Sequence, residues 1–281
     1  MNTVNQTFNW SRFTAALRKE VVENKRALLF AILCIYGLLS MIMILGNLVA
    51  FGAGNVADAL SSRIPQMVVG SIMTVVVCVA ASMAFRDLRT KSGRVGLFTS
   101  PSSTLEKFLV NVLIYVVGLF VAYFACAQLA DLTRIAALWL FSGKGLVVPG
   151  PINFLTSLNV MVSQADYAEV GLQRFGFMMI LGLVSNAGMY LLGSVIWPRL
   201  SLLKTFAALY AIEFGVFIIA LPFFALFGDV EALGAWFVKW VTEGAFTDAM
   251  VVCVCVQIVL FFGLAWYLFK RKDVISLKWW K

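Results

Sequence analysis

The chain alternates between long apolar runs and short segments that hold most of the charged residues. The apolar runs are about 20 residues long, which is the length needed to cross a hydrocarbon core of roughly 30 Å. They lie roughly at residues 27–49, 66–85, 107–129, 175–197, 204–227 and 249–269. Because the runs are continuously apolar, they lack the alternation of a membrane β-barrel. We predict an all-α polytopic membrane protein, with six transmembrane helices in a single transmembrane domain, residues 1–281.

The composition agrees with this pattern. The chain is 62% hydrophobic and only 13% charged, whereas an ordinary soluble domain is about one quarter charged. The N-terminus lacks the apolar core and the small-residue cleavage site of a signal peptide, so we expect the whole chain to be mature.

The positions of the basic residues predict the orientation. Six crossings place both termini on the same side of the membrane, and basic residues concentrate in cytoplasmic segments. With both termini in the cytoplasm, the inside segments hold 17 Lys and Arg and the outside segments hold 5. We therefore predict cytoplasmic termini. The net charge of +8 then needs no nucleic acid as a partner.

Residues 1–26 predict an amphipathic helix that lies in the headgroup plane. Trp10, Phe13, Leu17 and Val21 share one helical face, and basic residues lie largely elsewhere around the helix. An aromatic-bearing, basic, amphipathic helix next to a span is typical of the membrane interface. The alternative is a solvated cytoplasmic tail.

Two longer segments are predicted to lie outside, in addition to the short loop at 50–65. In residues 130–174, the part from Leu132 to Phe141 predicts a helix on the outer surface. Residues 228–248 carry an apolar stripe at helical spacing that is too short to cross, which indicates a re-entrant or surface helix. The stripe comprises Leu233, Trp236, Phe237, Trp240 and Val241. The alternative is that these Trp residues only belong to the aromatic belt.

Little in the chain supports catalysis. There is no histidine, which removes the commonest general base and metal ligand. The five cysteines all fall inside apolar runs, so we interpret them as small buried apolar side chains. No phosphate-binding loop of the G-x-x-x-x-G-K-[ST] type is present. We expect no catalytic, cofactor-binding or metal-binding residues.

Glu213 is the one ionisable residue well inside a predicted span. A carboxyl group is costly in lipid, and such residues usually face a bundle interior, water or a partner chain. The functional interpretation is a proton-linked or substrate-contacting carboxylate. The structural interpretation is a protonated or hydrogen-bonded side chain.

Residues 85–108, here called the charged loop, carry the densest charge between two spans. The charged residues are Arg86, Asp87, Arg89, Lys91, Arg94, Glu106 and Lys107. Such a loop can anchor the topology or bind a soluble partner. Its apolar residues are interleaved among the charges, which favours a protein-binding surface. Ser103 and Glu106 have the spacing of a capping box that begins the next helix directly after Pro101.

Two short motifs resemble those of a known transporter family. Phe85-Arg86-Asp87-Leu88 and Pro101-Ser102-Ser103-Thr104-Leu105-Glu106-Lys107-Phe108 resemble F-x-x-L and P-A-S-x-x-E-K-F, with Ser102 where alanine is usual. Leu202-Leu203-Lys204-Thr205 resembles an F-x-K-T element. With the layout of nearly the whole chain, these motifs resemble the permease subunits of bacterial ABC transporters of the second, exporter-like type, in a small six-span branch.

The resemblance implies a non-catalytic permease in the bacterial cytoplasmic membrane. It implies a partner ABC ATPase that binds the ATP, a second copy of the chain or a paralogous permease, and surrounding lipid. Residues 86–100 would form a cytoplasmic coupling helix that contacts the ATPase. The coupling residues would be Arg86, Asp87, Leu88, Arg89, Lys91 and Arg94, followed by the motif residues Pro101, Ser103, Glu106 and Lys107.

Two other functions stay open at this point. One is an ATP-independent secondary transporter or channel that uses Glu213. The other is a membrane anchor or assembly subunit of an envelope complex. The apolar, aromatic spans favour a lipid-like, peptide or hydrophobic drug-like cargo.

Overall fold

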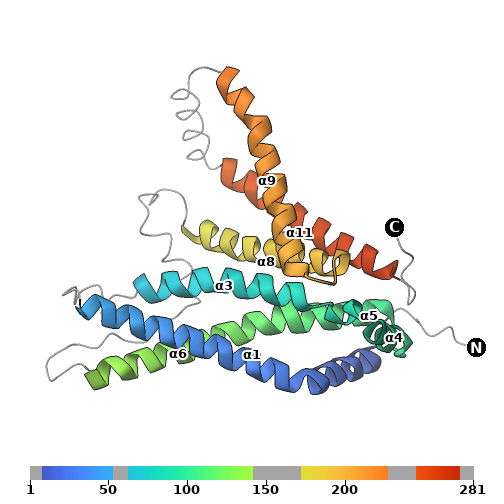
Figure 1. The fold of residues 1–281 in the computed structure, drawn as a ribbon, viewed down its shortest axis with the longest axis horizontal. Coiled ribbons are helices and arrows are strands. Elements are labelled where there is room, and N and C mark those ends of the chain that lie inside the picture. Colours follow the sequence, from blue (N-terminus) through green and yellow to red (C-terminus); the bar gives the residue numbers. More distant parts are fainter. Residues whose placement is uncertain (1–7, 53–62, 142–171, 227–244, 273–281) are drawn as a thin grey trace, which may run out of the picture. The chain divides into compact units, whose positions relative to one another are not determined.

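The computed structural model describes residues 8–52, 63–141, 172–226 and 245–272, and within these ranges the regular elements are all helical (Figure 1). The elements, in chain order, are α1 (Trp10–Gly52), α3 (Arg63–Met83), the 3₁₀ helix η1 (Arg86–Arg89), α4 (Lys91–Thr99), α5 (Thr104–Val112), the π-helix η2 (Leu113–Gly118), α6 (Leu119–Phe141), α8 (Leu172–Ile196), α9 (Ser201–Leu226) and α11 (Ala245–Lys270).

Several of these helices are long and apolar enough to cross a membrane. Within the described residues, four such stretches occur: Trp10–Val49, Thr104–Leu140, Ser201–Ile219 and Ala249–Lys270. Two shorter apolar stretches, Val69–Met83 and Ile180–Ile196, lie in α3 and α8. The all-α membrane fold is therefore confirmed, whereas the number of six spans stays a prediction.

Two helices continue past the boundaries that we predicted. The first 26 residues were expected to form an element separate from the first span, but α1 is one helix of 43 residues, and it is bent along its length (Figure 1). Likewise, α5, η2 and α6 follow one another without a break as far as Phe141, so the helix expected at Leu132–Phe141 is the end of a long one. The apolar stripe of residues 233–241 lies outside the described residues.

The chain divides into two compact units. The first unit contains residues 1–80 and 105–168, and the second contains residues 81–104 and 169–281. In the first unit, α1 packs along α6. The Tyr123 hydroxyl of α6 donates a hydrogen bond to the Val69 carbonyl oxygen of α3 at 2.6 Å. A bonded hydroxyl at a buried helix face fixes the position of α3 on α6.

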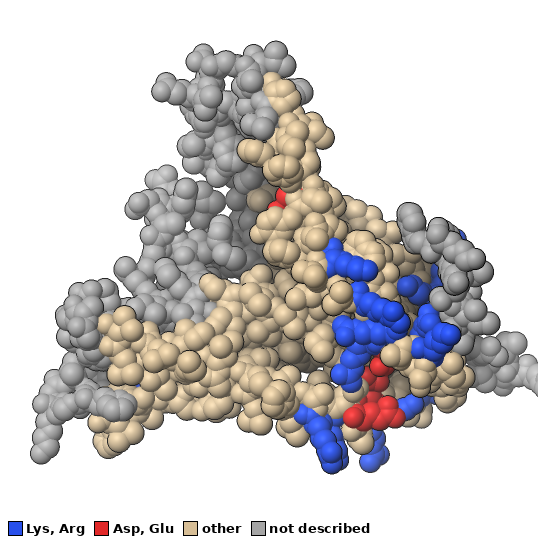
Figure 2. All heavy atoms as spheres, in the orientation of Figure 1, with Lys and Arg blue, Asp and Glu red and all other residues tan. Residues whose placement is uncertain are grey.

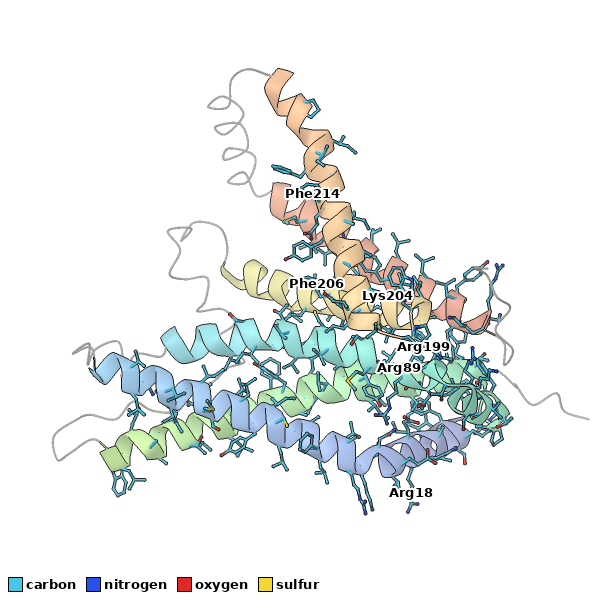
Figure 3. The ribbon with its side chains drawn as sticks, in the orientation of Figure 1. Arg18, Arg89, Arg199, Lys204, Phe206 and Phe214 are labelled. Atoms are coloured by element: carbon cyan, nitrogen blue, oxygen red, sulfur yellow. The ribbon has the colours of Figure 1, made fainter. Side chains whose placement is uncertain are left out.

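In the second unit, α8 packs closely against α11. Gly188 makes this approach possible, because a Cβ atom at this position would lie 2.8 Å from the ring of Phe262. Gly193 plays the same part against the first turn of α9, where a Cβ would overlap the side chain of Thr205. Beyond that turn, most side chains of α9 are exposed, Phe206 and Phe214 among them (Figure 3).

The cysteines differ from our expectation in their burial. Cys126 is buried and Cys78 is half-buried, but Cys34, Cys253 and Cys255 are exposed. The prediction of buried side chains was therefore wrong for three of the five, because they lie on helix faces that the chain itself does not cover. All five are free thiols.

Candidate functional site

The charged loop is an ordered helical element. After α3, the chain forms η1 and then α4, with Thr90 as the N-cap of α4. The Thr90 hydroxyl accepts a hydrogen bond from the backbone N–H of Gly93 at 3.0 Å. Gly93 itself lies against η1, since a Cβ atom there would approach the Asp87 carbonyl oxygen too closely to be accommodated. The compact shape of the loop therefore requires glycine at position 93.

One hydrogen bond joins the loop to the turn between α8 and α9. The Arg89 Nε donates to the carbonyl oxygen of Pro198 at 2.7 Å, across 109 residues of sequence. Pro198 lies between α8 and α9, outside both helices, so its carbonyl oxygen can accept a hydrogen bond from a side chain. Arg89 and Arg199 consequently lie at the start of α9, which also carries Lys204 (Figure 3).

Aromatic rings join the loop to the end of α11. The ring of Phe269 lies 4.9 Å from that of Phe85 and 6.2 Å from that of Phe98, centroid to centroid. Phe85 and Phe269 are 2% and 0% exposed. Aromatic pairs at these distances contribute about 0.5–1.5 kcal/mol beyond the burial of their area. The two ends of the loop helices are thus held by one side chain of α11.

These contacts bring basic residues of three segments together in the second unit. We call this set the basic face: Arg86, Arg89, Lys91, Arg94, Arg199, Lys204, Lys270, Arg271 and Lys272. Figure 2 shows Lys and Arg side chains gathered around the start of α9 and the end of α11. Among the described residues of these three segments, Asp87 is the one acidic residue.

The charges of the basic face affect one another. Burial lowers the pKa of Lys272 from its ordinary value, and the positive charge of Arg94 lowers it further. The Nε of Arg94 is buried without a hydrogen-bond partner. Like charges in partly buried positions raise the free energy of the face, because water screens them incompletely.

The predicted coupling residues differ in how far they are buried. Leu88 is buried at 3% exposure, and Asp87, Arg86 and Arg94 are half-buried. Arg89 and Lys91 are exposed. Leu88 therefore packs inside the loop, and the charged residues are the part of this set that can reach another molecule.

The predicted motif residues lie before α5 or within its first turn. Pro101 and Ser103 lie directly before α5. Lys107 is buried at 7% exposure. Its carbonyl oxygen accepts a hydrogen bond from the side-chain amide of Asn111 at 3.1 Å. These residues belong to the entry of the chain into α5 rather than to the basic face.

Glu106 has a role that the sequence did not indicate. Its Oε1 accepts a hydrogen bond from the backbone N–H of Asn9 at 2.8 Å and pairs with the Arg12 Nη2 at 3.1 Å. The carboxylate is fully buried, whereas the Arg12 side chain is 39% exposed. A carboxylate at the first N–H groups of α1 is also favoured by the helix dipole. Glu106 thus fixes the start of α1 against α5.

A second buried ion pair lies in α6. The Arg134 Nε donates to the Asp131 Oδ1 at 2.7 Å, and both side chains are 1% exposed. Both Nη atoms of Arg134 are buried without a hydrogen-bond partner. Both residues lie in the segment 130–174, which the sequence predicts to be outside. The i, i+3 spacing of opposite charges was the signal that could have indicated the pair.

Glu213 is exposed on α9. The described part of the chain offers it no hydrogen bond or ion pair. Within the second unit, it therefore does not face the packed interior between helices.

The described residues contain no group of three or more acidic, cysteine or histidine side chains that could hold a metal ion. Comparison with known proteins found no matching family model, no matching curated protein and no matching solved structure. The function is therefore argued from the chain itself.

Proposed function

We propose that this chain is the membrane-spanning permease subunit of an ATP-driven ABC transporter, most similar in type to bacterial exporters. In this proposal, the chain has six spans and lies in the cytoplasmic membrane with both termini in the cytoplasm. A separate ATPase subunit hydrolyses ATP, and a second permease copy or a paralogue completes the transporter.

The observation that carries the proposal is the architecture of the charged loop. A segment that only anchors topology needs basic residues but no tertiary contacts. This loop instead has two short helices, a glycine that their packing requires at position 93, and a bond from Arg89 to the turn between α8 and α9. Such a preorganised surface supports a role in binding another protein.

The attachments of the loop also support a coupling role. ATP can shift the permease between two states only if the ATPase contacts those states differently. A displacement of the loop would pull on Pro198 through Arg89 and on α11 through Phe269. Force applied at the loop would therefore reach the ends of three membrane helices of the second unit: α8, α9 and α11.

The test begins with the neighbouring open reading frames: this proposal expects one of them to encode an ABC ATPase, which is then co-expressed with the chain. We expect the two proteins to co-purify and to hydrolyse ATP as a complex. The triple variant Arg86→Glu, Arg89→Glu, Arg94→Glu should lose both assembly and coupled hydrolysis, because the loop then repels an acidic partner. Lys91→Glu changes only an exposed side chain of the loop. Weaker assembly in this variant would therefore come from the reversed charge and not from misfolding.

Unchanged assembly and hydrolysis in the triple variant would reject the coupling role. Stable complexes that lack any ATPase, without transport, would instead favour a membrane anchor or assembly subunit.

A second candidate is an ATP-independent transporter or channel that uses Glu213. The exposed carboxyl on α9, without a partner in the described residues, favours it. This function predicts pH-dependent flux in liposomes without ATP. Glu213→Gln should abolish the pH dependence, and an unchanged profile would remove this candidate.

A further inference from the structure

The basic face is built by three segments that are far apart in the sequence. The loop contributes Arg86, Arg89, Lys91 and Arg94, the turn and first helical residues of α9 contribute Arg199 and Lys204, and the end of α11 contributes Lys270, Arg271 and Lys272. The Arg89–Pro198 hydrogen bond and the Phe269 ring contacts hold these segments together.

Basic residues far outnumber acidic ones in this face within the described part of the second unit. Asp87 is the one acidic residue of the three segments there. Glu213 lies about two and a half turns further along α9 than Lys204, and Asp248 lies at the opposite end of α11 from Lys270. Converging like charges cost free energy that an acidic partner would recover. The half-buried Arg94 and Lys272 gain most, because water screens them least.

We infer that the basic face as a whole, rather than the charged loop alone, is the docking surface for an acidic patch on a folded soluble protein. The inference rests on the proposed function, in which that protein is the ATPase subunit. The turn before α9 and the end of α11 then contact the partner directly, through Arg199 and Lys204 and through Lys270 and Arg271.

The rigidity of the face favours a protein over a lipid surface as its occupant. Anionic headgroups are mobile, and a flexible basic segment attracts them by charge alone. The basic face is instead fixed by a side chain–backbone hydrogen bond and by buried aromatic rings. Fixed positions of charge provide register and specificity towards a partner whose own charges are fixed.

The experiment measures affinity for the ATPase subunit that the proposed function requires, with the full-length chain in nanodiscs that contain phosphatidylglycerol. Two double variants remove the newly assigned parts of the face: Arg199→Glu with Lys204→Glu, and Lys270→Glu with Arg271→Glu. All four side chains are exposed. We expect each pair to raise the Kd about tenfold or more, with a weaker salt dependence than in the wild type.

The matched control is Arg18→Glu with Lys25→Glu. These side chains are also basic and exposed, but they lie on α1 in the first unit (Figure 3). The control should change the Kd less than about twofold, because the charges lie outside the docking surface. Unchanged thermal unfolding in each variant checks that it folds.

Three outcomes oppose the inference. If only loop variants weaken binding, the proposed function stands but the wider docking surface does not. If the new variants keep the ATPase affinity and lose co-purified phosphatidylglycerol, the surface binds lipid. If the wild-type chain does not bind the ATPase, the proposed function and the inference both fail.

Discussion

A buried ion pair of the first unit and the basic face of the second unit use charged residues in opposite ways. In the first unit, Glu106 is fully buried and satisfied by Arg12 and by the backbone of Asn9. In the second unit, the basic face gathers nine basic residues with one acid. A buried, paired charge fixes one arrangement of helices. A surface on which like charges converge costs free energy, and so it is suited to an acidic partner.

The largest expected effect tests the buried ion pair between Glu106 and Arg12. Glu106→Ala leaves Arg12 and the Asn9 N–H without their acceptor, so we expect the free energy of unfolding to fall by about 2 kcal/mol. This value is below that for a wholly buried pair, because Arg12 is partly exposed. Thermal unfolding in detergent measures it.

The control for this variant is Glu23→Ala, which breaks the exposed pair between Lys19 and Glu23. We expect a change of at most about 0.5 kcal/mol. Equal losses in Glu106→Ala and Glu23→Ala would show that burial does not distinguish the two pairs.

The second prediction separates the shape of the charged loop from its charge. Gly93→Ala adds a Cβ against the Asp87 carbonyl and the Thr90 hydroxyl, so we expect a loss of about 1 kcal/mol in local stability and weaker binding of the proposed ATPase partner. Hydrogen exchange of residues 86–99 and the Kd measure the two effects.

Gly96→Ala is the matched control in the same helix, because nothing lies within 4 Å of a Cβ at position 96. It should stabilise α4 slightly, by up to about 1 kcal/mol, and leave binding unchanged. If both variants bind the ATPase as the wild type does, the loop does not need its folded shape.

The smallest expected effect tests the basic face, at Lys272. The pKa of Lys272 is lowered by burial and by Arg94, so its charged form destabilises the folded state at neutral pH. Lys272→Met should therefore raise the Tm, on the order of 2 °C, while it weakens binding of the ATPase.

The pH dependence has a definite sign. The wild-type chain loses the destabilisation as the pH rises from the lowered pKa towards the ordinary value of 10.5. The advantage of Lys272→Met in Tm should shrink over the same interval. An advantage that is constant from pH 7 to pH 10.5 would contradict a role of this charge in the stability.

The sequence predicted the helices well, because each depends on a local property. A long apolar run bounded by charge, Gly or Pro needs no tertiary information, and α8, α9 and α11 begin and end within a few residues of the predicted spans. The predicted boundary between an interfacial helix and the first span, at residues 26 and 27, was wrong because it also depended on local polarity alone. Local polarity changes there, but a helix continues through such a change when its backbone hydrogen bonds do.

The contacts that make the candidate site could not be predicted in this way. Arg89 and Pro198 are separated by 109 residues, and Arg12 and Glu106 by 94. Nothing in a single sequence pairs such positions. The capping-box spacing correctly placed the start of α5, but it gave no indication that Glu106 reaches another helix.

The route of the chain through the two units has a consequence for synthesis. Residues 81–104 belong to the second unit, although the chain then returns to the first. At about 5–20 residues per second, the ribosome needs roughly 5–20 s to produce Pro198 after Arg89. During that interval, the loop has left the ribosome without its later contacts. The basic face is therefore completed only after Phe269 has been made, so a partner that needs the whole face can bind only after that residue.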